Sequence, residues 1–140
     1  METEDSVKEY LVQGLTHHIN GDFDQAIAAC TNAIQLDPND ANVYFFRGSA
    51  YLNKGDYDSA IADFTQAIQL NPNNSMIYCN RGVAYAGKGD FDRTAEDVDT
   101  VLRLDPDNAQ VKQLIELAQL IRSGSSQQEA GNTDNGYTDK

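Results

Sequence analysis

Basic residues are scarce in this sequence, with 10 lysines and arginines against 22 aspartates and glutamates and a net charge of −12. Proteins that bind phosphate backbones need clustered positive charge, so this balance excludes nucleic acid as an expected partner, and anionic membrane with it. Long apolar runs are also absent, and none approaches the roughly 18 to 20 residues of a membrane span. The 140 residues suffice for one domain of ordinary size.

Cysteine is nearly absent too, with Cys30 and Cys79 as the only thiols. They form no CxxC motif and have no nearby histidine, so we expect neither a metal site nor a bound cofactor. This cysteine usage is typical of reduced thiols in an intracellular protein. Met1 is followed by acidic residues instead of the basic stretch that opens a signal peptide, and the sequence therefore predicts a cytoplasmic location.

The sequence does contain an internal repeat of 34 residues. Pro38, Pro72 and Pro106 are spaced by this interval. The same shift relates three segments of the form Gly-Asp-aromatic-Asp. This spacing divides the sequence into three repeat units, residues 7–40, 41–74 and 75–108. A fixed period of this length is typical of proteins that are built from stacked helical units.

The pattern within each unit predicts two helices. In the second unit, apolar or small residues recur at helical spacing in two runs that are separated by Gly55 and Asp56. The glycine suits the left-handed end of the first helix, and Asp56 or Asp58 can cap the start of the second. Pro72 lies where a helix cannot continue.

These residues resemble the pattern of the tetratricopeptide repeat (TPR) family. The matching residues of the second unit are Gly48, Tyr51, Gly55, Asp56, Tyr57, Ala60, Phe64, Ala67 and Pro72, with Tyr44 where tryptophan is typical. Gly48 and Ala60 mark the close approach of the two helices. The resemblance implies an all-α, right-handed α-solenoid of three antiparallel helical hairpins, which serves as a protein-protein interaction module.

The regions outside the repeats differ in character. Residues 1–6 form an acidic leader, and residues 109–122 form an amphipathic helix that we expect to cap the open end of the solenoid. The predicted TPR domain therefore spans residues 7–122. Residues 123–140 are small and polar with little to bury, and we expect this tail to be disordered.

No motif in the sequence supplies catalytic chemistry. Residues 82–88 match a phosphate-binding loop only in part, because a glycine follows where Ser or Thr is required and no strand precedes them. Cys30 is in frame with Phe64 and is expected to be an inert buried thiol. Cys79 is in frame with Phe45 and is expected to face the concave surface without a neighbouring base. We therefore expect that the protein is not an enzyme.

The functional surface that the resemblance implies is the concave groove, which is lined by the first helix of each repeat. The inward positions of this chain are mainly apolar. The candidate partner-binding residues are Leu11, Val12, Leu15, Phe45, Phe46, Ser49, Leu52, Met76, Cys79, Asn80 and Val83. The predicted capping helix can add Leu114 and Leu117.

One subfamily of TPR proteins binds the C-terminal carboxylates of heat-shock chaperones through Lys, Asn and Arg at set positions in the groove. The matching positions here are Leu11, Leu15, Phe46, Met76 and Asn80. One amide without a cation cannot compensate for desolvating a carboxylate, so we do not expect a chaperone C-terminus as the partner.

Two interpretations of the apolar groove stay open. It can bind an apolar or amphipathic segment of a protein partner, because contiguous exposed apolar surface marks interaction sites. Alternatively, the capping helix or a second copy of the chain fills it, and the protein is a self-associating scaffold with a homodimer interface. The fold alone names no partner.

A pair of charges recurs in the second and third units and is missing from the first. Arg47 and Arg81 stand at equivalent places, as do Asp63 and Asp97 in the helices that follow. The arginine and the aspartate thus occur together in a repeat unit or are both missing from it. We predict that Arg47 pairs with Asp63 and Arg81 with Asp97, within a hairpin or between neighbouring hairpins. The alternative is that the arginines bind an anionic ligand.

Overall fold

The computed structural model describes residues 2–117, 119–120 and 123, and this part of the chain consists of helices and short connections. The labelled helices are α1 (Glu2–Ile19), α2 (Phe23–Leu36), α3 (Ala41–Lys54), α4 (Tyr57–Leu70), α5 (Ser75–Lys88) and α6 (Phe91–Leu104). Residues 109–117 and 119–120 are helical as well, and we call them the C-terminal helix. The predicted all-α fold is confirmed.

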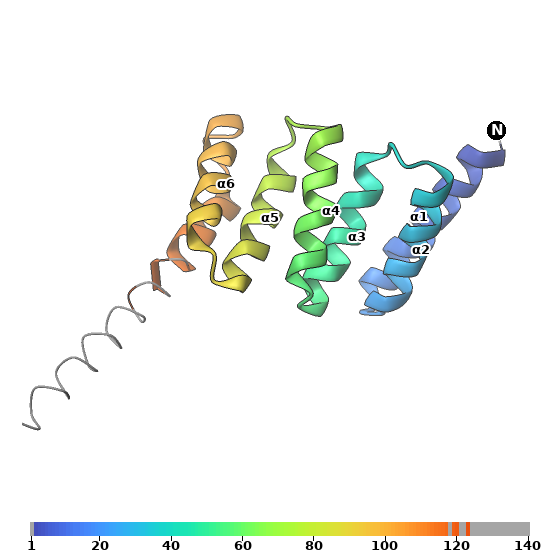
Figure 1. Ribbon diagram of the computed structural model, residues 1–140, viewed down its shortest axis with the longest axis horizontal. Coiled ribbons are helices and arrows are strands. Elements are labelled where there is room, and N and C mark those ends of the chain that lie inside the picture. The colour runs from blue at the N-terminus through green and yellow to red at the C-terminus, as the bar shows by residue number, and fades with distance from the viewer. Residues whose placement is uncertain (1, 118, 121–122, 124–140) are drawn as a thin grey trace, which may run out of the picture.

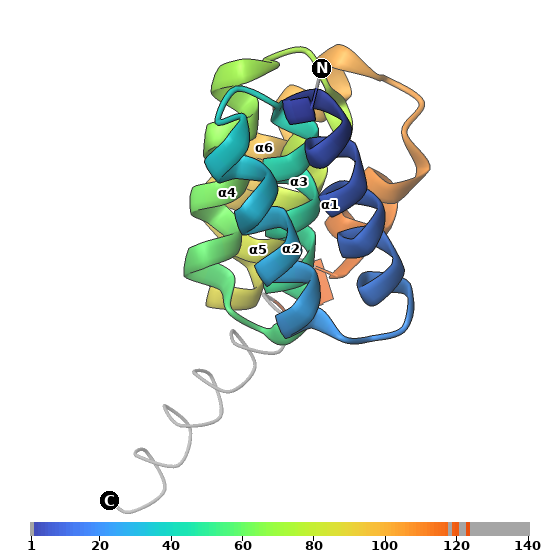
Figure 2. The same cartoon turned by 90° about the vertical axis from the view of Figure 1, so that its right-hand side faces the viewer.

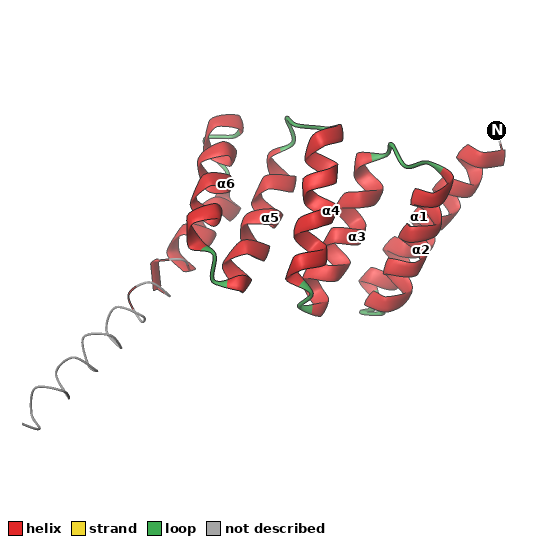
Figure 3. Ribbon diagram, in the orientation of Figure 1, coloured by secondary structure: helices red, strands yellow, loops and turns green. Residues whose placement is uncertain are grey.

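The helices form three antiparallel hairpins that stack side by side. Within a hairpin, α1 packs on α2, α3 on α4 and α5 on α6, while α2 packs also on α3 and α4 on α5. Figure 1 shows the hairpins as a row from α1 to α6. Along that row, α2 and α4 lie on one side and α1 on the other (Figure 2), and only short loops join them (Figure 3). The chain is therefore an all-α solenoid.

The structure also describes the segments that flank the three repeats. α1 begins at Glu2, so residues 2–6 of the expected acidic leader belong to the first helix. In the C-terminal helix, Val111 and Leu114 are buried against Cys79 and Val98. This helix thus covers the apolar face that α5 and α6 present. The predicted disordered tail lies outside the described residues, apart from Ser123.

The turns follow the predicted chemistry. Gly55 ends α3 with φ of 82°, a left-handed conformation that glycine adopts without a steric penalty. Asp56 then caps α4, because its carboxylate accepts a hydrogen bond of 3.3 Å from the backbone N–H of Ser59. The loop after α2 is held in addition by the Tyr44 hydroxyl, which donates to the Pro38 carbonyl over 3.0 Å.

The close approach predicted at Gly48 is present between α3 and α4. A Cβ atom on Gly48 would lie 2.8 Å from the ring of Phe64, which is fully buried. The neighbouring Ala60 and Ala67 are fully buried too. A larger side chain at Gly48 would therefore have to push the two helices apart. None of the helices that the structure describes is both long and apolar enough to cross a membrane.

Candidate partner-binding groove

The most accessible candidates lie on the first and fifth helices. Val12 on α1 is 62% exposed and Met76 on α5 is 49% exposed. Leu117 of the C-terminal helix is also 49% exposed. Large apolar side chains with about half or more of their surface in solvent carry a cost that burial would remove. Val12, Met76 and Leu117 therefore present apolar surface to solvent.

Phe45 and Phe46 of α3 are partly buried and pack against the hydrophobic core. Their rings meet edge to face with centroids 5.5 Å apart, and the ring of Phe45 lies 6.0 Å from that of Phe64. Phe46 packs beside Val43 and Leu11, where the first two hairpins meet. Both phenylalanines are therefore half-buried, with their rings packed against neighbouring side chains.

Cys79 is more enclosed than its predicted place on the concave surface implies. Its side chain is only 3% exposed, because the C-terminal helix packs over it with Val111 and Leu114. Burial raises the pKa of the Cys79 thiol, which makes it less reactive. Cys30 is buried as expected, and burial raises its pKa from 9.0 to about 11. Both thiols are structural.

The C-terminal half of the groove contains two adjoining hollows that share Val83 and Leu117. The first is lined by Cys79, Asn80, Val83, Gln110, Gln113, Leu114 and Leu117. The second is lined by Leu52, Asn53, Tyr57, Val83, Ala86, Gly87 and Leu117. The structure thus brings together Leu52, Cys79, Asn80 and Val83 from the predicted set.

Sequence reasoning missed the part that Tyr57 and Gly87 play in the second hollow. Tyr57 extends from the start of α4 across to α5, where a Cβ on Gly87 would lie 2.5 Å from its ring. The sequence held a signal for this contact. At the place of Gly87, the first two units carry Ile19 and Asn53, and only the third unit carries glycine. Gly87 makes room for the aromatic ring.

Polar groups near the groove are mostly occupied by contacts within the protein. The Ser49 hydroxyl donates to the carbonyl of Phe45 over 2.9 Å, within its own helix. The His18 ring and the Asn53 side-chain amide lie 3.0 Å apart and link α1 to α3. Among the described residues, the side-chain amide of Asn80 has no such link, and neither do those of Gln110 and Gln113 in the same hollow. Leu11 and Leu15 are half-buried.

The predicted ion pairs are confirmed, and each lies within one hairpin. Arg47 on α3 donates to both carboxylate oxygens of Asp63 on α4, over 2.8 and 2.7 Å. It also donates to the Thr31 hydroxyl of the preceding hairpin over 3.2 Å. The hydrogen bond to Asp63 raises the pKa of Arg47. Arg81 repeats this arrangement with Asp97 and Thr65.

The contact with a threonine of the preceding hairpin was not predicted. It makes each arginine a bridge between three helices, and the guanidinium group of Arg47 also lies about 6 Å from the rings of Tyr44 and Tyr51. Each arginine thus uses its Nε and both terminal nitrogens for hydrogen bonds inside the protein. This disfavours the alternative in which the arginines bind an anionic ligand.

Comparison with known proteins places the chain in a family. No curated protein matches it. Among solved structures, the second TPR domain of human RPAP3 in complex with the HSP70 peptide SGPTIEEVD is 28% identical, with a TM-score of 0.80 over 84% of this chain and 98% of that one. Two further structures share the fold. The Arabidopsis OM64 TPR domain is 23% identical, with a TM-score of 0.80 over 84% of this chain and 97% of that one. The TPR2B domain of yeast Sti1 in its pHsp70 complex is 24% identical, with a TM-score of 0.78 over 82% of this chain and 97% of that one.

Family models agree with the structural likeness. The model described as TPR repeat matches residues 14–55 and 48–89, which is more than half of the chain. A second, described as tetratricopeptide repeat, matches residues 77–108. The matched segments cover α2 to α6 and the C-terminal part of α1, from residue 14 on. The chain therefore belongs to the tetratricopeptide repeat family.

Proposed function

We propose that the protein is a non-catalytic interaction module that binds an apolar or amphipathic segment of a protein partner in its concave groove. The observation that carries this proposal is the exposure of Val12, Met76 and Leu117 on the inward positions of their helices. Half-buried phenylalanines stand between them as fixed walls. Such a surface recognises side chains of matching shape and low polarity.

The composition of the groove distinguishes this chain from relatives that bind chaperone peptides. The peptide bound to the human RPAP3 domain ends in Glu-Glu-Val-Asp, and its recognition requires groups that stabilise carboxylates. At the five corresponding positions this chain carries four apolar residues and Asn80. A desolvated carboxylate there would have no cation as a partner. We therefore assign the groove to an apolar segment.

The net charge of −12 adds a preference for the flanks of the partner segment. Asp24 and Asp58 are paired with Lys54 and Lys88, but other acidic residues are exposed on helices and turns, for example Glu4, Glu9 and Asp107. A negative surface attracts basic residues at long range and accelerates association with them. The proposed partner segment is thus apolar in its centre and basic at its ends.

A selection from a library of random peptides tests this proposal. We expect the wild-type protein to enrich apolar sequences with basic flanks, and Val12→Glu and Met76→Glu to lose those peptides because they place charge in the groove. Leu36→Glu is the matched control, since Leu36 is a 43% exposed apolar residue near the end of α2, away from the groove. Enrichment of acidic C-termini would contradict the proposal.

The homodimer alternative is tested in the same preparation. Light scattering coupled to size-exclusion chromatography gives the mass of the wild-type protein over a range of concentrations. A monomer at all concentrations agrees with a groove that is open to a partner. A dimer that Met76→Glu dissociates would assign the groove to self-association instead.

A further inference from the structure

Two equivalent junctions join neighbouring hairpins near the turns between their helices. In the first junction, the start of α2 meets the end of α3 through the ion pair of Asp24 and Lys54. In the second junction, the start of α4 meets the end of α5 through the ion pair of Asp58 and Lys88. A shift of 34 residues relates the two pairs. Differences between the junctions therefore show what is particular to each.

Polar side chains close the first junction. The ring nitrogen Nε2 of His18 and the side-chain amide nitrogen of Asn53 lie 3.0 Å apart and form a hydrogen bond between α1 and α3. The ring of His18 also packs edge to face against Phe23, with the two ring centroids 5.3 Å apart. The three side chains thus find their partners within the protein.

The second junction cannot be closed in this way. At the three equivalent places it carries Leu52, Tyr57 and Gly87. Leucine and glycine have no side-chain group that could form a hydrogen bond across the junction. The ring of Tyr57 needs glycine beside it, because a Cβ atom on Gly87 would lie 2.5 Å away. The second hollow of the groove lies at this place and has a volume of about 370 Å³.

The chemistry of the second hollow selects an apolar occupant. The residues that line it are uncharged, and the amide of Asn53 among them already bonds to His18. The charged groups of the junction, Asp58 and Lys88, pair with each other. A charged side chain in the hollow would therefore lose hydration without gaining a partner. An apolar side chain would instead bury its surface against Leu52, Val83 and Leu117.

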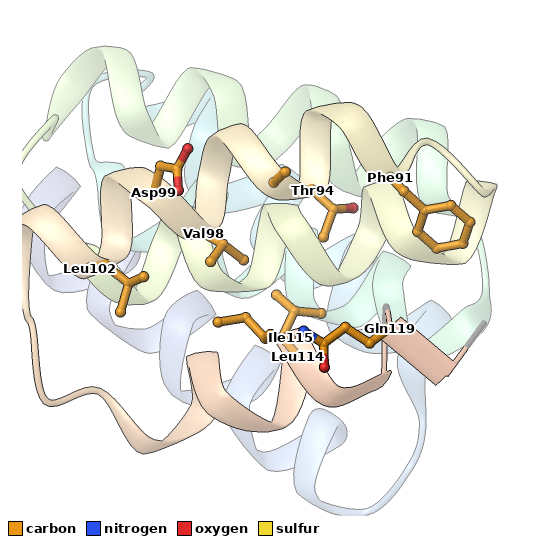
Figure 4. A pocket seen from close by; sticks show the side chains of 9 residues that line it. Phe91, Thr94, Val98, Asp99, Leu102, Leu114, Ile115 and Gln119 are labelled. Atoms are coloured by element: carbon orange, nitrogen blue, oxygen red, sulfur yellow. The ribbon is translucent and has the colours of Figure 1, made fainter. Parts of the chain in front are cut away.

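A third hollow, between α6 and the C-terminal helix, is less suited to an apolar side chain. It has a volume of about 270 Å³, and Figure 4 shows Asp99 and Gln119 among the side chains that line it. Filling this hollow with an apolar group would remove water from the Asp99 carboxylate. The third hollow is therefore an internal control for a probe of the second.

We infer that the second hollow is the specificity pocket of the groove and takes one large apolar side chain of the partner segment, such as that of leucine or phenylalanine. The inference rests on the proposed function, because the segment that supplies this side chain is the one bound in the groove. It assigns one anchor of that segment to a definite place, and Leu52, Tyr57 and Gly87 determine the shape of that place.

Blocked amino acids test the pocket without a partner segment. The probes are the N-acetyl methylamides of leucine and phenylalanine, and that of glutamate is the charged control. The wild-type protein is labelled with 13C at its alanine, isoleucine and leucine methyl groups, and the signals are assigned by substitution. Leu52 and Ala86 line only the second hollow. Leu114 lines the first and the third, and Ile115 lines the third.

We expect the leucine and phenylalanine probes to shift the signals of Leu52 and Ala86, with dissociation constants in the millimolar range that suits so small a ligand. The signals of Leu114 and Ile115 should stay unchanged, and the glutamate probe should shift none of the four. Shifts confined to Leu114 or Ile115, or no shift at all, would overturn the inference.

A graft of the first junction onto the second supplies the matched variant. It combines Leu52→His, Tyr57→Phe and Gly87→Asn, and thermal unfolding shows whether it folds. Read from the Ala86 signal, the graft should weaken both apolar probes about tenfold or more. Leu117→Gln changes a side chain that is 49% exposed and should also weaken them, so it gives the answer if the graft does not fold. Unchanged affinity in either folded variant would overturn the inference.

The pocket and the groove proposal can fail separately. Peptides from the library selection that Val12→Glu and Met76→Glu abolish, but that the graft binds as tightly as the wild type, would overturn the pocket and leave the groove in place. Binding of the leucine probe at Leu52 in a protein that selects no peptide would keep the pocket and overturn the groove proposal.

Discussion

Arg47 donates two hydrogen bonds to the carboxylate of Asp63, and this contact joins the two helices of the second hairpin. The Asp63 side chain is 7% exposed and that of Arg47 is 20% exposed. A pair in this environment depends on both partners, because either charge alone would be desolvated without compensation. Arg81 and Asp97 repeat the contact in the third hairpin.

Removing one partner of this pair should destabilise the protein more than removing both. We expect Arg47→Met to lower the free energy of unfolding by about 3 to 5 kcal/mol, because it leaves the Asp63 carboxylate buried and unpaired. Asp63→Leu in the same protein should recover part of that loss. Urea unfolding of the wild type, both single variants and the double variant measures the coupling energy.

The ion pair between Lys54 and Asp24 is the matched control for this cycle. Both side chains are largely exposed, at 42% and 81%, so their pairing is screened by water and salt. Their coupling energy should be well below that of Arg47 and Asp63. Equal coupling in the two cycles would mean that burial does not strengthen the inner pair.

Gly48 of α3 and Gly82 of α5 should respond differently to replacement by alanine. Gly48→Ala forces a Cβ against Phe64, which is fully buried and cannot move, so we expect a loss of about 1 to 3 kcal/mol. Gly82→Ala meets the end of the Leu114 side chain at 3.2 Å, which can shift, and the gain of about 0.5 to 1 kcal/mol in helix propensity should offset the contact.

Thermal unfolding of both glycine variants checks this difference. The two positions are 34 residues apart in the same register, so each variant is the control of the other. A midpoint for Gly48→Ala that equals or exceeds that of Gly82→Ala would show that the second hairpin is more loosely packed than the contact with Phe64 indicates.

Stability should fall at alkaline pH because of Cys30. The thiol ionises near 9.0 in the unfolded chain, whereas burial raises its pKa to about 11 in the folded protein. Between these values the unfolded state releases a proton that the folded state retains, so unfolding becomes more favourable as the pH rises. We expect the free energy of unfolding to decline over this range by more in the wild type than in Cys30→Ala. Parallel pH profiles would contradict the role of the buried thiol.

The chaperone peptide SGPTIEEVD should not bind to this protein. Its relative, the second TPR domain of human RPAP3, is in complex with that peptide and serves as the positive control. Isothermal titration under identical conditions compares the two proteins. Heat of binding from this chain that Met76→Glu abolishes would show that an apolar groove can hold the acidic terminus after all.

The repeat register made much of the fold predictable, because each turn depends on local chemistry. Gly55 and Asp56 occupy the places that a left-handed turn and a helix cap require, and the structure has both. The pairing of Arg47 with Asp63 was predictable for a related reason, since charges that occur together in successive repeats satisfy each other. Register alone placed both residues on facing helices.

The exposure of the groove residues was less predictable. Cys79 has the same register position as Phe45 but packs against the C-terminal helix. The repeat pattern does not give the orientation of this helix, so it could not show which residues the helix covers. The bond from Arg47 to Thr31 was missed because Thr31 lies in the preceding hairpin. Both features depend on contacts between units, whereas the repeat pattern describes a single unit.

The methyl signal of Met76 offers the most direct test of the groove proposal. The chain has two methionines, Met1 and Met76, so a protein labelled with 13C at the methionine methyl group gives one signal from within the groove. On titration with a peptide from the library selection, we expect the Met76 signal to shift and to saturate at the affinity measured separately for that peptide by fluorescence anisotropy. A peptide that binds while the Met76 signal stays unchanged would contradict binding in the concave groove.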